Sequence, residues 1–502
     1  MIFQPDTEAN RRLKSHVAPD AWTNPTPAEK YNLVVIGGGP CGLIAAAGAA
    51  GLGAKVALIE RYAMGGDCLN VGCVPSKGLI RAARAAAQVK RAAEFGVITP
   101  KAEMDFSAAM ERMRGIRADI SHIDGVQRYQ DELGVDVFLG EGKFTSPNTI
   151  EVDGNTLHFK KALIATGARA ARIPVPGLWE SGAHTNETIF SLTELPSRLA
   201  VIGGGPIGCE LSQSFARFGA SVSLFDNAYH ILSREDGDAA AIVQKSIAAD
   251  GVRILCNSSI EKVSTDGDEK IIHYQSQGKN KELRVDAILV AVGRTPNIEG
   301  LDLEKAGVTA HQRGIEIDDS LRTANKNIYA AGDVAVKYQF THTADAAARI
   351  VIQNALFHGR KKLSSLTVPW CTYTEPEIAH VGMYEKEADD QGIETDTYVQ
   401  KFDHVDRAIL DGESEGFVKV HTRKGTAEIL GATIVATHAG DMISELTLAI
   451  THGIGLDQIA STIHPYPTQA EAIKKVADSY SRTKLTPFVS RIFKKWLAWT
   501  RR

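Results

Sequence analysis

Two cysteines with four residues between them, Cys68 and Cys73, stand in a glycine-rich segment that begins at Gly65. Cysteines this close in sequence can change between a dithiol and a disulfide with little backbone movement. Lys77 follows Cys73 by one helical turn, and a nearby cation lowers the pKa of a thiol and favours the reactive thiolate. Beside a bound redox cofactor, such a pair would accept electrons. The segment therefore predicts a redox enzyme.

A dinucleotide-binding pattern precedes the cysteines. An apolar strand at 34–36 runs into Gly37, Gly39 and Gly42, a small-residue helix follows, and a second strand ends at Glu60. The glycines allow a tight turn and the close approach of a pyrophosphate to a helix N-terminus. The acid can accept a hydrogen bond from a ribose hydroxyl. Strand, glycines, helix and acid together form the full pattern.

The whole unit recurs in the second half of the chain. A strand at 199–202 runs into Gly203, Gly205 and Gly208, and a helix and a strand then lead to Asp226. Two complete units predict two bound dinucleotides. An acid repels a 2′-phosphate, so Asp226 favours NAD over NADP at the second site.

With these residues in place, the chain resembles the flavin-dependent pyridine nucleotide–disulfide oxidoreductases, a family that includes dihydrolipoamide dehydrogenase, glutathione reductase and mercuric reductase. The resemblance extends from about residue 31 to about residue 484. Besides the segments above, five stretches carry it: 165–167, 291–297, 328–333, 373–377 and 464–471.

The resemblance implies an α/β fold with two Rossmann-like dinucleotide-binding domains, a C-terminal α+β dimerisation domain and a homodimer. Helices are expected at 77–93, 106–133 and 344–356, and mixed strands and helices after 366. The expected divisions are an N-terminal arm at 1–30, an FAD-binding domain at 31–175 that resumes at 299–365, an NAD(P)-binding domain at 176–298, a dimerisation domain at 366–484 and a basic tail at 485–502.

The resemblance also assigns roles to single residues. Cys73 would be the thiolate against the flavin and Cys68 the sulfur that exchanges with substrate, while Lys77 would lie near the flavin and pair with Glu210. A cation at that position would stabilise reduced flavin, which tends to be anionic. Asp333 would bind the ribityl or pyrophosphate region of FAD. The positions expected to hold FAD and NAD(P)H are Gly37, Gly39, Gly42, Glu60, Lys77, Thr166, Gly167, Asp333, Gly203, Gly205, Gly208, Asp226, Gly293 and Arg294.

One departure from the family lies beside the first cysteine. The family usually has Thr where this chain has Asp67. A charged carboxylate there would raise the pKa of Cys68 by repelling its thiolate. Alternatively, the carboxylate is solvated or hydrogen-bonded.

A second departure concerns the proton donor. Disulfide-reducing members place a histidine five residues before a glutamate and contribute the pair to the partner subunit's site, but here Tyr466 stands five residues before Glu471. Tyrosine, with an ordinary pKa near 10, is a poor base at pH 7. His464, two residues away, is an alternative, although we expect it to be structural.

The tyrosine resembles mercuric reductase, in which the acceptor is a metal ion. That enzyme carries a cysteine pair near its C-terminus, whereas this chain has no cysteine after Cys371. The acceptor could therefore be a metal ion, a disulfide, a quinone or a small oxidant. The prediction is an NAD(P)H oxidoreductase, with NADH favoured, that passes electrons through FAD and the Cys68–Cys73 disulfide. Dihydrolipoamide dehydrogenase activity, direct reduction of quinones from flavin, and a non-catalytic redox sensor are the alternatives.

Composition bounds the remaining possibilities. A net charge of −4 over 502 residues gives no sign of nucleic-acid binding, and six cysteines in so long a chain are not a disulfide scaffold. No second close Cys or His pair accompanies the first, so no metal site is predicted. The other four cysteines are interpreted as ordinary buried thiols: Cys41, Cys209, Cys256 and Cys371.

The two ends of the chain differ. The first 30 residues are polar, without an apolar stretch typical of a secretory signal, which favours a cytoplasmic enzyme with an ordered surface arm or a disordered leader. The tail is a basic amphipathic helix that could pack on its own subunit or the dimer partner, or could contact the inner face of a membrane. One face of it holds Phe488, Val489, Ile492, Phe493, Trp496 and Leu497, and the other holds Arg491, Lys494 and Lys495.

Overall fold

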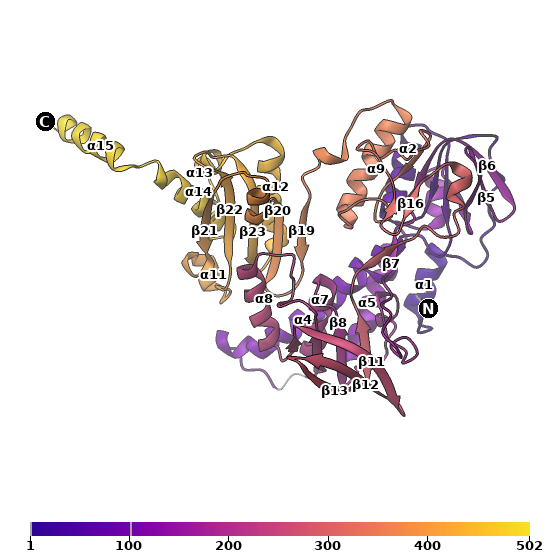
Figure 1. The fold of residues 1–502 in the computed structure, drawn as a ribbon, viewed down its shortest axis with the longest axis horizontal. Coiled ribbons are helices and arrows are strands. Elements are labelled where there is room, and N and C mark those ends of the chain that lie inside the picture. Colours follow the sequence, from indigo (N-terminus) through magenta and orange to yellow (C-terminus); the bar gives the residue numbers. More distant parts are fainter. Residues whose placement is uncertain (1–2, 101–102, 502) are drawn as a thin grey trace. The chain divides into compact units, whose positions relative to one another are not determined.

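The apolar run before the first glycine pattern forms β1 (Tyr31–Ile36), a central strand of a mainly parallel sheet. The computed structural model describes residues 3–100 and 103–501, which fall into two units (Figure 1). Unit 1 contains Met1–Tyr229 and Gly251–Leu366, and unit 2 contains His230–Asp250 and Thr367–Arg502. The sequence assigned 230–250 to the NAD(P)-binding domain, whereas the contacts of these residues group them with the C-terminal part of the chain.

The first sheet of unit 1 positions the first glycine turn. Its parallel strands have the order β3-β2-β1-β6, and β18 also pairs in parallel with β6. On the other side of β6 the sheet continues with the antiparallel strands β5 and β4. The order changes direction between β1 and β6, and ligands bind at such switch points. The other strands are β2 (Val56–Glu60), β3 (Asp136–Leu139), β4 (Lys143–Ser146), β5 (Thr149–Val152), β6 (Asn155–Ile164) and β18 (Ile328–Ala330).

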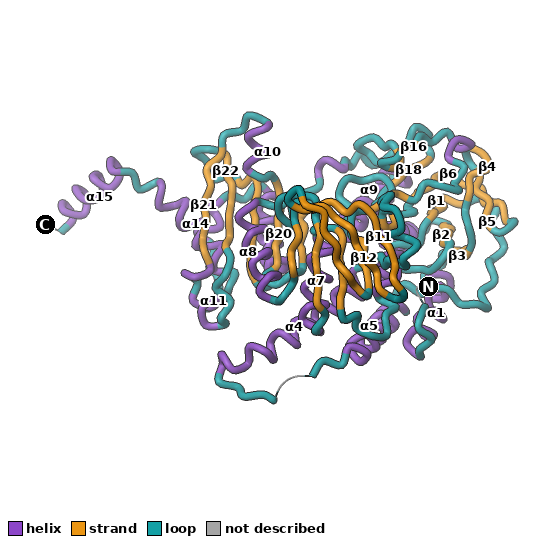
Figure 2. Tube along the Cα trace, turned by 60° about the horizontal axis from the view of Figure 1, so that its bottom comes forward, coloured by secondary structure: helices purple, strands orange, loops and turns teal. Residues whose placement is uncertain are grey.

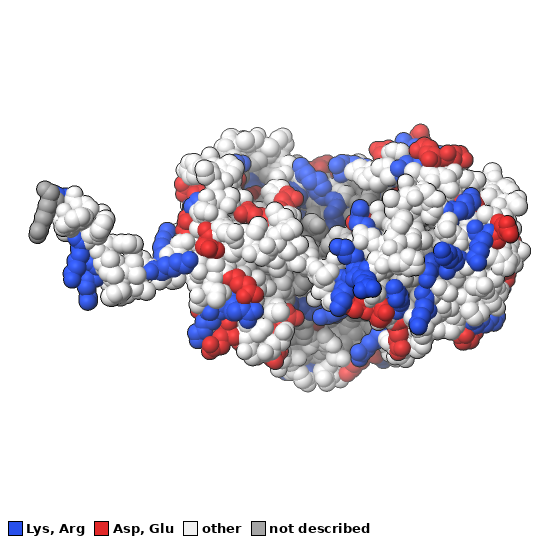
Figure 3. Space-filling model, turned by 90° about the horizontal axis from the view of Figure 1, so that it is seen from above, with Lys and Arg blue, Asp and Glu red and all other residues white. Residues whose placement is uncertain are grey.

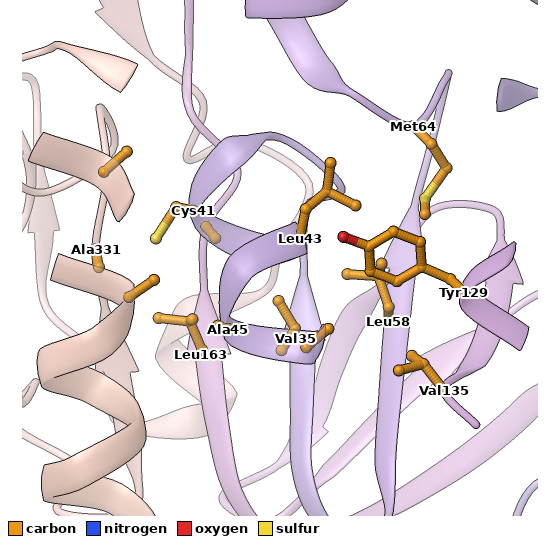
Figure 4. Close-up of a cluster of buried hydrophobic side chains, with 14 of the residues drawn as sticks. Val35, Cys41, Leu43, Ala45, Leu58, Met64, Tyr129, Val135, Leu163 and Ala331 are labelled. Atoms are coloured by element: carbon orange, nitrogen blue, oxygen red, sulfur yellow. The ribbon is translucent and has the colours of Figure 1, made fainter. Parts of the chain in front are cut away.

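Small residues let the next helix pack closely on this sheet. The helix α2 (Pro40–Gly51) begins directly after the glycine turn and is almost entirely Ala, Gly, Leu and Ile. Figure 4 shows Leu43 and Ala45 of α2 beside Val35, Leu58 and Leu163 of the sheet, within one buried cluster. The helix α9 (Thr341–Leu356) contributes to the same cluster. This core fixes the start of α2 against the ends of the strands.

The second glycine turn repeats the arrangement. A parallel sheet of order β10-β9-β8-β14 leads from β8 into α7 (Pro206–Phe218), as β1 leads into α2. Among the described residues of unit 1, three antiparallel strands and two short pairs complete the sheets, and Figure 2 shows two of the three, β11 and β12, side by side. These strands are β7 (Ala168–Ala170), β8 (Arg198–Ile202), β9 (Ser221–Phe225), β10 (Arg253–Leu255), β11 (Ser258–Asp266), β12 (Glu269–Ser276), β13 (Lys279–Val285), β14 (Ala287–Val290), β15 (Arg294–Pro296), β16 (Ala310–His311) and β17 (Gly314–Ile315).

One predicted helix is shorter than expected. A helix was expected at 106–133, but α5 (Phe106–Ser121) ends twelve residues earlier. Beyond Ser121, three successive tight turns as far as Gly125 replace the helical hydrogen bonds. A short π-helical turn, η2 (Arg128–Glu132), follows. The remaining helices of unit 1 are α1 (Glu8–Val17), α3 (Gly66–Val71), α4 (Cys73–Arg91), η1 (Ala92–Phe95), α6 (Asn186–Ile189), η3 (Leu303–Ala306) and η4 (Leu363–Ser365).

Unit 2 is built on a five-stranded antiparallel sheet of order β19-β20-β23-β22-β21. Helices α12 and α14 supply apolar residues to its core. The strands are β19 (Pro369–Thr372), β20 (Glu377–Gly382), β21 (Thr395–Lys401), β22 (Phe417–Arg423) and β23 (Ile429–Ala436). The helices are α8 (Gly237–Ala249), α10 (Glu385–Asp390), η5 (Phe402–His404), α11 (Asp406–Leu410), α12 (Ala439–His452), α13 (Leu456–Ser461), α14 (Glu471–Thr483) and α15 (Pro487–Thr500).

The N-terminal arm is an ordered part of unit 1. Thr7 caps α1 by accepting a hydrogen bond from the Asn10 backbone, and Leu13 and Val17 on one face of α1 are fully buried. The helix packs against α5. Of the two predicted states of the arm, the described residues adopt the ordered one.

Candidate active site

The two cysteines lie at the junction of two helices. Cys68 is in α3, Cys73 is the first residue of α4, and both are free thiols in this structure. Gly72 separates the helices, and a Cβ there would lie 2.8 Å from the Asp67 carbonyl oxygen, so the tight junction requires glycine. Cys73 also lies 3.5 Å from the Thr341 hydroxyl, measured from Sγ to Oγ1.

These surroundings separate the two thiols electrostatically. A hydrogen bond from Cys68, with smaller contributions from Thr341 and Lys77, lowers the pKa of Cys73 to about 6 although burial opposes the shift. The same hydrogen bond and burial raise the pKa of Cys68. A position at the N-terminus of a helix also favours a negative charge. At neutral pH Cys73 is therefore the thiolate and Cys68 the thiol.

Lys77 and Glu210 form an ion pair beside the cysteines. Lys77 Nζ lies 2.9 Å from Glu210 Oε2, and the Glu210 side chain is only 6% exposed. Lys77 belongs to α4 and Glu210 to α7, two helices that pack together. The pairing that the resemblance implied is therefore present in the structure. It brings the helix of the second glycine turn to the helix that begins with Cys73.

Asp67 has a partner far away in the sequence. Its carboxylate accepts a hydrogen bond from the Arg294 guanidinium, which also donates to the Ala168 carbonyl oxygen at 2.6 Å. Arg294 Nε lies 3.4 Å from Asp333 Oδ2. Of the alternatives for Asp67, the hydrogen-bonded one is found, and the raised pKa of Cys68 comes from Cys73 and burial rather than from Asp67.

The N-terminal arm is connected to the cysteine segment through a buried arginine. Arg117 is 1% exposed and donates to the Asn70 carbonyl oxygen of α3 at 2.6 Å and to Asn10 Oδ1 of α1 at 2.7 Å. The Met64 amide donates to the Val17 carbonyl oxygen at 3.0 Å. One buried guanidinium thus joins α1, α5 and α3.

The first glycine turn fits a pyrophosphate. A Cβ on Gly37 would lie 2.3 Å from the Ala165 carbonyl oxygen, and a Cβ on Gly42 would lie 1.8 Å from the Gly37 carbonyl oxygen. The packing of the protein itself therefore requires glycine at these two positions. A Cβ on Gly39 would meet its nearest atom only at 3.8 Å. The space at the middle glycine is therefore open to a ligand. Glu60, at the end of β2, accepts from the Gly38 amide at 2.6 Å, and burial raises its pKa.

The second turn has the same construction. A Cβ on Gly203 would lie 2.4 Å from the Ala291 carbonyl oxygen, and one on Gly208 would lie 1.8 Å from that of Gly203. Nothing lies within 4 Å of a Cβ on Gly205, which again leaves space for a ligand. Asp226 follows β9 and accepts from the Gly204 amide at 2.6 Å.

Two other predicted motifs are joined to each other. The Thr166 hydroxyl donates to the Asn297 carbonyl oxygen at 2.7 Å, and the Asn297 side-chain amide returns a bond to Thr166 at 2.9 Å. The backbone N–H of Asn297 donates a hydrogen bond to the Gly167 carbonyl oxygen, and the backbone N–H of Ala171 donates one to the Gly293 carbonyl oxygen. The paired strands β7 and β15 hold these contacts and carry Arg294 toward Asp67.

The predicted proton-donor residues lie in unit 2. Tyr466 is 68% exposed, and its hydroxyl donates to Asp406 Oδ2 at 2.8 Å, which raises its pKa. Although Tyr466 stands five residues before Glu471, within this chain its hydroxyl contacts Asp406. Glu471 begins α14 and its carboxylate turns along the helix toward Lys475, 3.7 Å away.

His464 is held by another residue of unit 2. Its Nε2 lies 2.9 Å from Glu445 Oε1, and its side chain is 6% exposed. A ring held in this way suits the structural role expected for it. Among residues 3–100 and 103–501, no group of three or more His, Cys, Asp or Glu side chains could hold a metal ion.

Sequence reasoning missed several residues around the site. Thr341, Arg117 and Asp406 belong to none of the recognised motifs. The packing of α1 had a signal, because Ala9, Leu13 and Val17 repeat at four-residue spacing behind a threonine cap. The other contacts join residues at least 47 positions apart and have no local pattern.

Comparison with protein families accounts for most of the chain. Residues 31–348 match the family described as pyridine nucleotide-disulphide oxidoreductase. Residues 368–477 match the dimerisation domain of the same family. The second match ends before α15 begins.

Curated relatives and solved structures agree with these matches. A mercuric reductase of Bacillus cereus is 35% identical over 473 residues, which are 94% of this chain and 75% of the relative. A dihydrolipoyl dehydrogenase of Geobacillus stearothermophilus is 35% identical over 451 residues, 89% of this chain and 95% of the relative. A Cu(II) complex of the HOCl-induced flavoprotein disulfide reductase RclA from Escherichia coli superposes with a TM-score of 0.80 and 28% identity over 90% of this chain and 99% of that one.

Proposed function

The chain belongs to the pyridine nucleotide-disulphide oxidoreductases, and we propose that Cys68 and Cys73 are the redox pair through which it reduces its acceptor. Family members are oxidoreductases that use FAD and NAD(P)H. The observation that carries the proposal is the asymmetry of the two thiols. Cys73, at the start of α4, is a stabilised thiolate, while Cys68 keeps its proton.

The residues of the two turns fit the two dinucleotides. Gly37, Gly39, Gly42 and Glu60 would hold FAD, together with Asp333. When bound, FAD would supply the redox chemistry, which is to accept a hydride from NAD(P)H and to pass the electron pair to a neighbouring disulfide. The chain's own contribution is to hold Cys73 as a thiolate and to keep the Lys77 cation close to it through Glu210.

The second turn favours NADH. Gly203, Gly205 and Gly208 would hold the pyrophosphate, and Asp226 would accept hydrogen bonds from the adenosine ribose. Asp226 already accepts two backbone bonds, from Gly204 at 2.6 Å and from Ala228 at 2.7 Å, and a carboxylate has further lone pairs for a ribose hydroxyl. A 2′-phosphate would meet this negative charge.

The acceptor that suits this site best is a thiophilic metal ion or a disulfide. In the dithiol state Cys68 attacks or binds the acceptor, and the two cysteines re-form their disulfide as the acceptor gains two electrons. The partner subunit's Tyr466 would line the acceptor pocket, as the family's dimerisation domain suggests. Because tyrosine is a poor acid–base group at pH 7, a metal ion, which leaves no thiolate to be protonated, is favoured over a disulfide. The names of the relatives, mercuric reductase and a disulfide reductase with Cu(II), support this class.

The proposed place of action is the cytoplasm, and the proposed assembly is a homodimer. The family's dimerisation domain supports the assembly. In the described part of the chain no helix is long and apolar enough to cross a bilayer.

An acceptor screen tests the function. The purified protein is reduced anaerobically with NADH, and its reoxidation is followed with mercuric ion, Cu(II), lipoamide, glutathione disulfide and quinones. Cys68→Ser should leave reduction by NADH intact and abolish turnover with metal ions and disulfides, while Cys256→Ser is the matched control. Unchanged turnover by Cys68→Ser would contradict the dithiol route. Reoxidation by quinones alone, in both variants, would favour direct reduction from flavin.

A further inference from the structure

The C-terminal helix α15 exposes an apolar face that the residues described by the structure do not cover. None of its residues is buried, and the large apolar side chains on it are between 47% and 68% exposed. They are Phe488, Ile492, Phe493, Trp496, Leu497 and Trp499. With 3.6 residues per turn, these side chains share one half of the helix.

The charged residues on the other half of α15 are all basic. Residues 484–502 contain six Lys or Arg residues and no Asp or Glu. The Lys and Arg side chains of α15 are the blue atoms on the helix in Figure 3. Arg491 and Lys494 lie opposite Trp496, Lys495 lies at the edge of the apolar half, and all three side chains are exposed. The segment is thus strongly positive in a protein whose net charge is −4.

We propose that α15 lies in the surface of an anionic lipid membrane, with its apolar face among the acyl chains and its basic face against the headgroups. Helices of this composition bind such surfaces through apolar burial and attraction to anionic lipid. Trp496 and Trp499 suit the boundary, because indole rings favour the bilayer interface. Arg491, Lys494 and Lys495 lie within the helix rather than at its ends, which suits a position in the membrane surface and not in the apolar layer.

A second copy of the chain is the less suitable occupant. The family's dimerisation domain ends at residue 477, before α15 starts at Pro487. If two α15 helices packed face to face, Lys495, which borders each apolar face, would lie near the basic side chains of the other copy, and α15 has no acid to pair with it. Anionic headgroups supply the opposite charge that this helix lacks.

Vesicle binding by the full-length, FAD-loaded protein tests the proposal. We expect the protein to float with vesicles of phosphatidylcholine and phosphatidylglycerol and not with vesicles of phosphatidylcholine alone. Replacing Arg491, Lys494 and Lys495 with Gln should reduce partitioning on the order of 100-fold, since each basic residue near an anionic surface contributes roughly fivefold. The matched control replaces three exposed lysines of unit 1, Lys262, Lys279 and Lys326, with Gln and should bind like the wild type.

Two further readouts distinguish the membrane from other occupants. Trp496→Ala/Phe493→Ala should weaken vesicle binding while keeping turnover with a soluble acceptor, because neither residue belongs to the redox site. A chain that ends at Leu485 should keep the mass of the native oligomer in sedimentation. Loss of the oligomer in that truncated chain would show that a second copy covers the face and would overturn the proposal. Absence of binding to anionic vesicles, or equal binding by the Gln variant and the wild type, would overturn it as well.

Discussion

Asp67 and Arg294 are paired, although 227 residues separate them in the sequence. Asp67 directly precedes Cys68, and Arg294 also faces Asp333, a predicted FAD-binding residue. The pair therefore joins the cysteine segment to the cofactor-binding part of unit 1. It also neutralises the one charge in this segment that would otherwise disfavour a thiolate at Cys68.

Removing the arginine should disturb both sites. In Arg294→Gln, the carboxylates of Asp67 and Asp333 lose their shared cation, so we expect weaker FAD retention and about tenfold slower alkylation of Cys68 in the reduced protein. Adding Asp67→Asn should restore most of the alkylation rate, because the unpaired charge beside Cys68 is then gone. Mass spectrometry of iodoacetamide-treated protein measures the rate at each cysteine. Equal rates in all variants would show that the pair does not influence Cys68.

The pH dependence of the thiolate follows from the surroundings of Cys73. Since its pKa is lowered to about 6, its alkylation rate should rise with pH and level off above that value. Lys77→Met should move the midpoint upward, because the cation is lost and the charge of Glu210 then opposes the thiolate. Lys90→Met, an exposed lysine of the same helix, is the control and should leave the midpoint in place. A midpoint near the ordinary thiol value in the wild type would contradict the assigned thiolate.

Nucleotide preference should depend on Asp226. Asp226→Ser removes the charge that repels a 2′-phosphate and one acceptor for the ribose. We expect KM for NADH to rise about tenfold and KM for NADPH to fall, with little change in kcat. Steady-state kinetics with both nucleotides measure the shift. An unchanged ratio of kcat/KM values would show that specificity lies elsewhere.

The N-terminal arm should contribute to the stability of the cysteine segment. Arg117→Met leaves the carbonyl of Asn70 and the side chain of Asn10 without this buried donor, which should lower the free energy of unfolding by about 2 kcal/mol or more. Urea unfolding of the FAD-loaded protein measures the loss. Arg112→Met, at an exposed position of α5, is the control and should have little effect. If the two variants unfolded alike, the arm would not support α3.

How much the sequence predicted depended on how local each signal was. The turns at Gly37 and Gly203 were predictable because strand, glycines, helix and acid follow one another within thirty residues. The Lys77–Glu210 pair was accessible only through the family resemblance, since its members lie in different helices. The Arg294–Asp67 contact could not be predicted, because it depends on how β15 is placed beside the cysteine segment. The end of α5 at Ser121 was missed because apolar residues continue in helical spacing beyond it.

The most direct test of the account is an anaerobic titration with NADH. If electrons pass from the cofactor to the Cys68–Cys73 disulfide, the wild type should consume twice as many NADH equivalents per bound flavin as the variant in which both cysteines are serine. An equal uptake by the two proteins, or a purified protein that binds no flavin, would contradict the central claim.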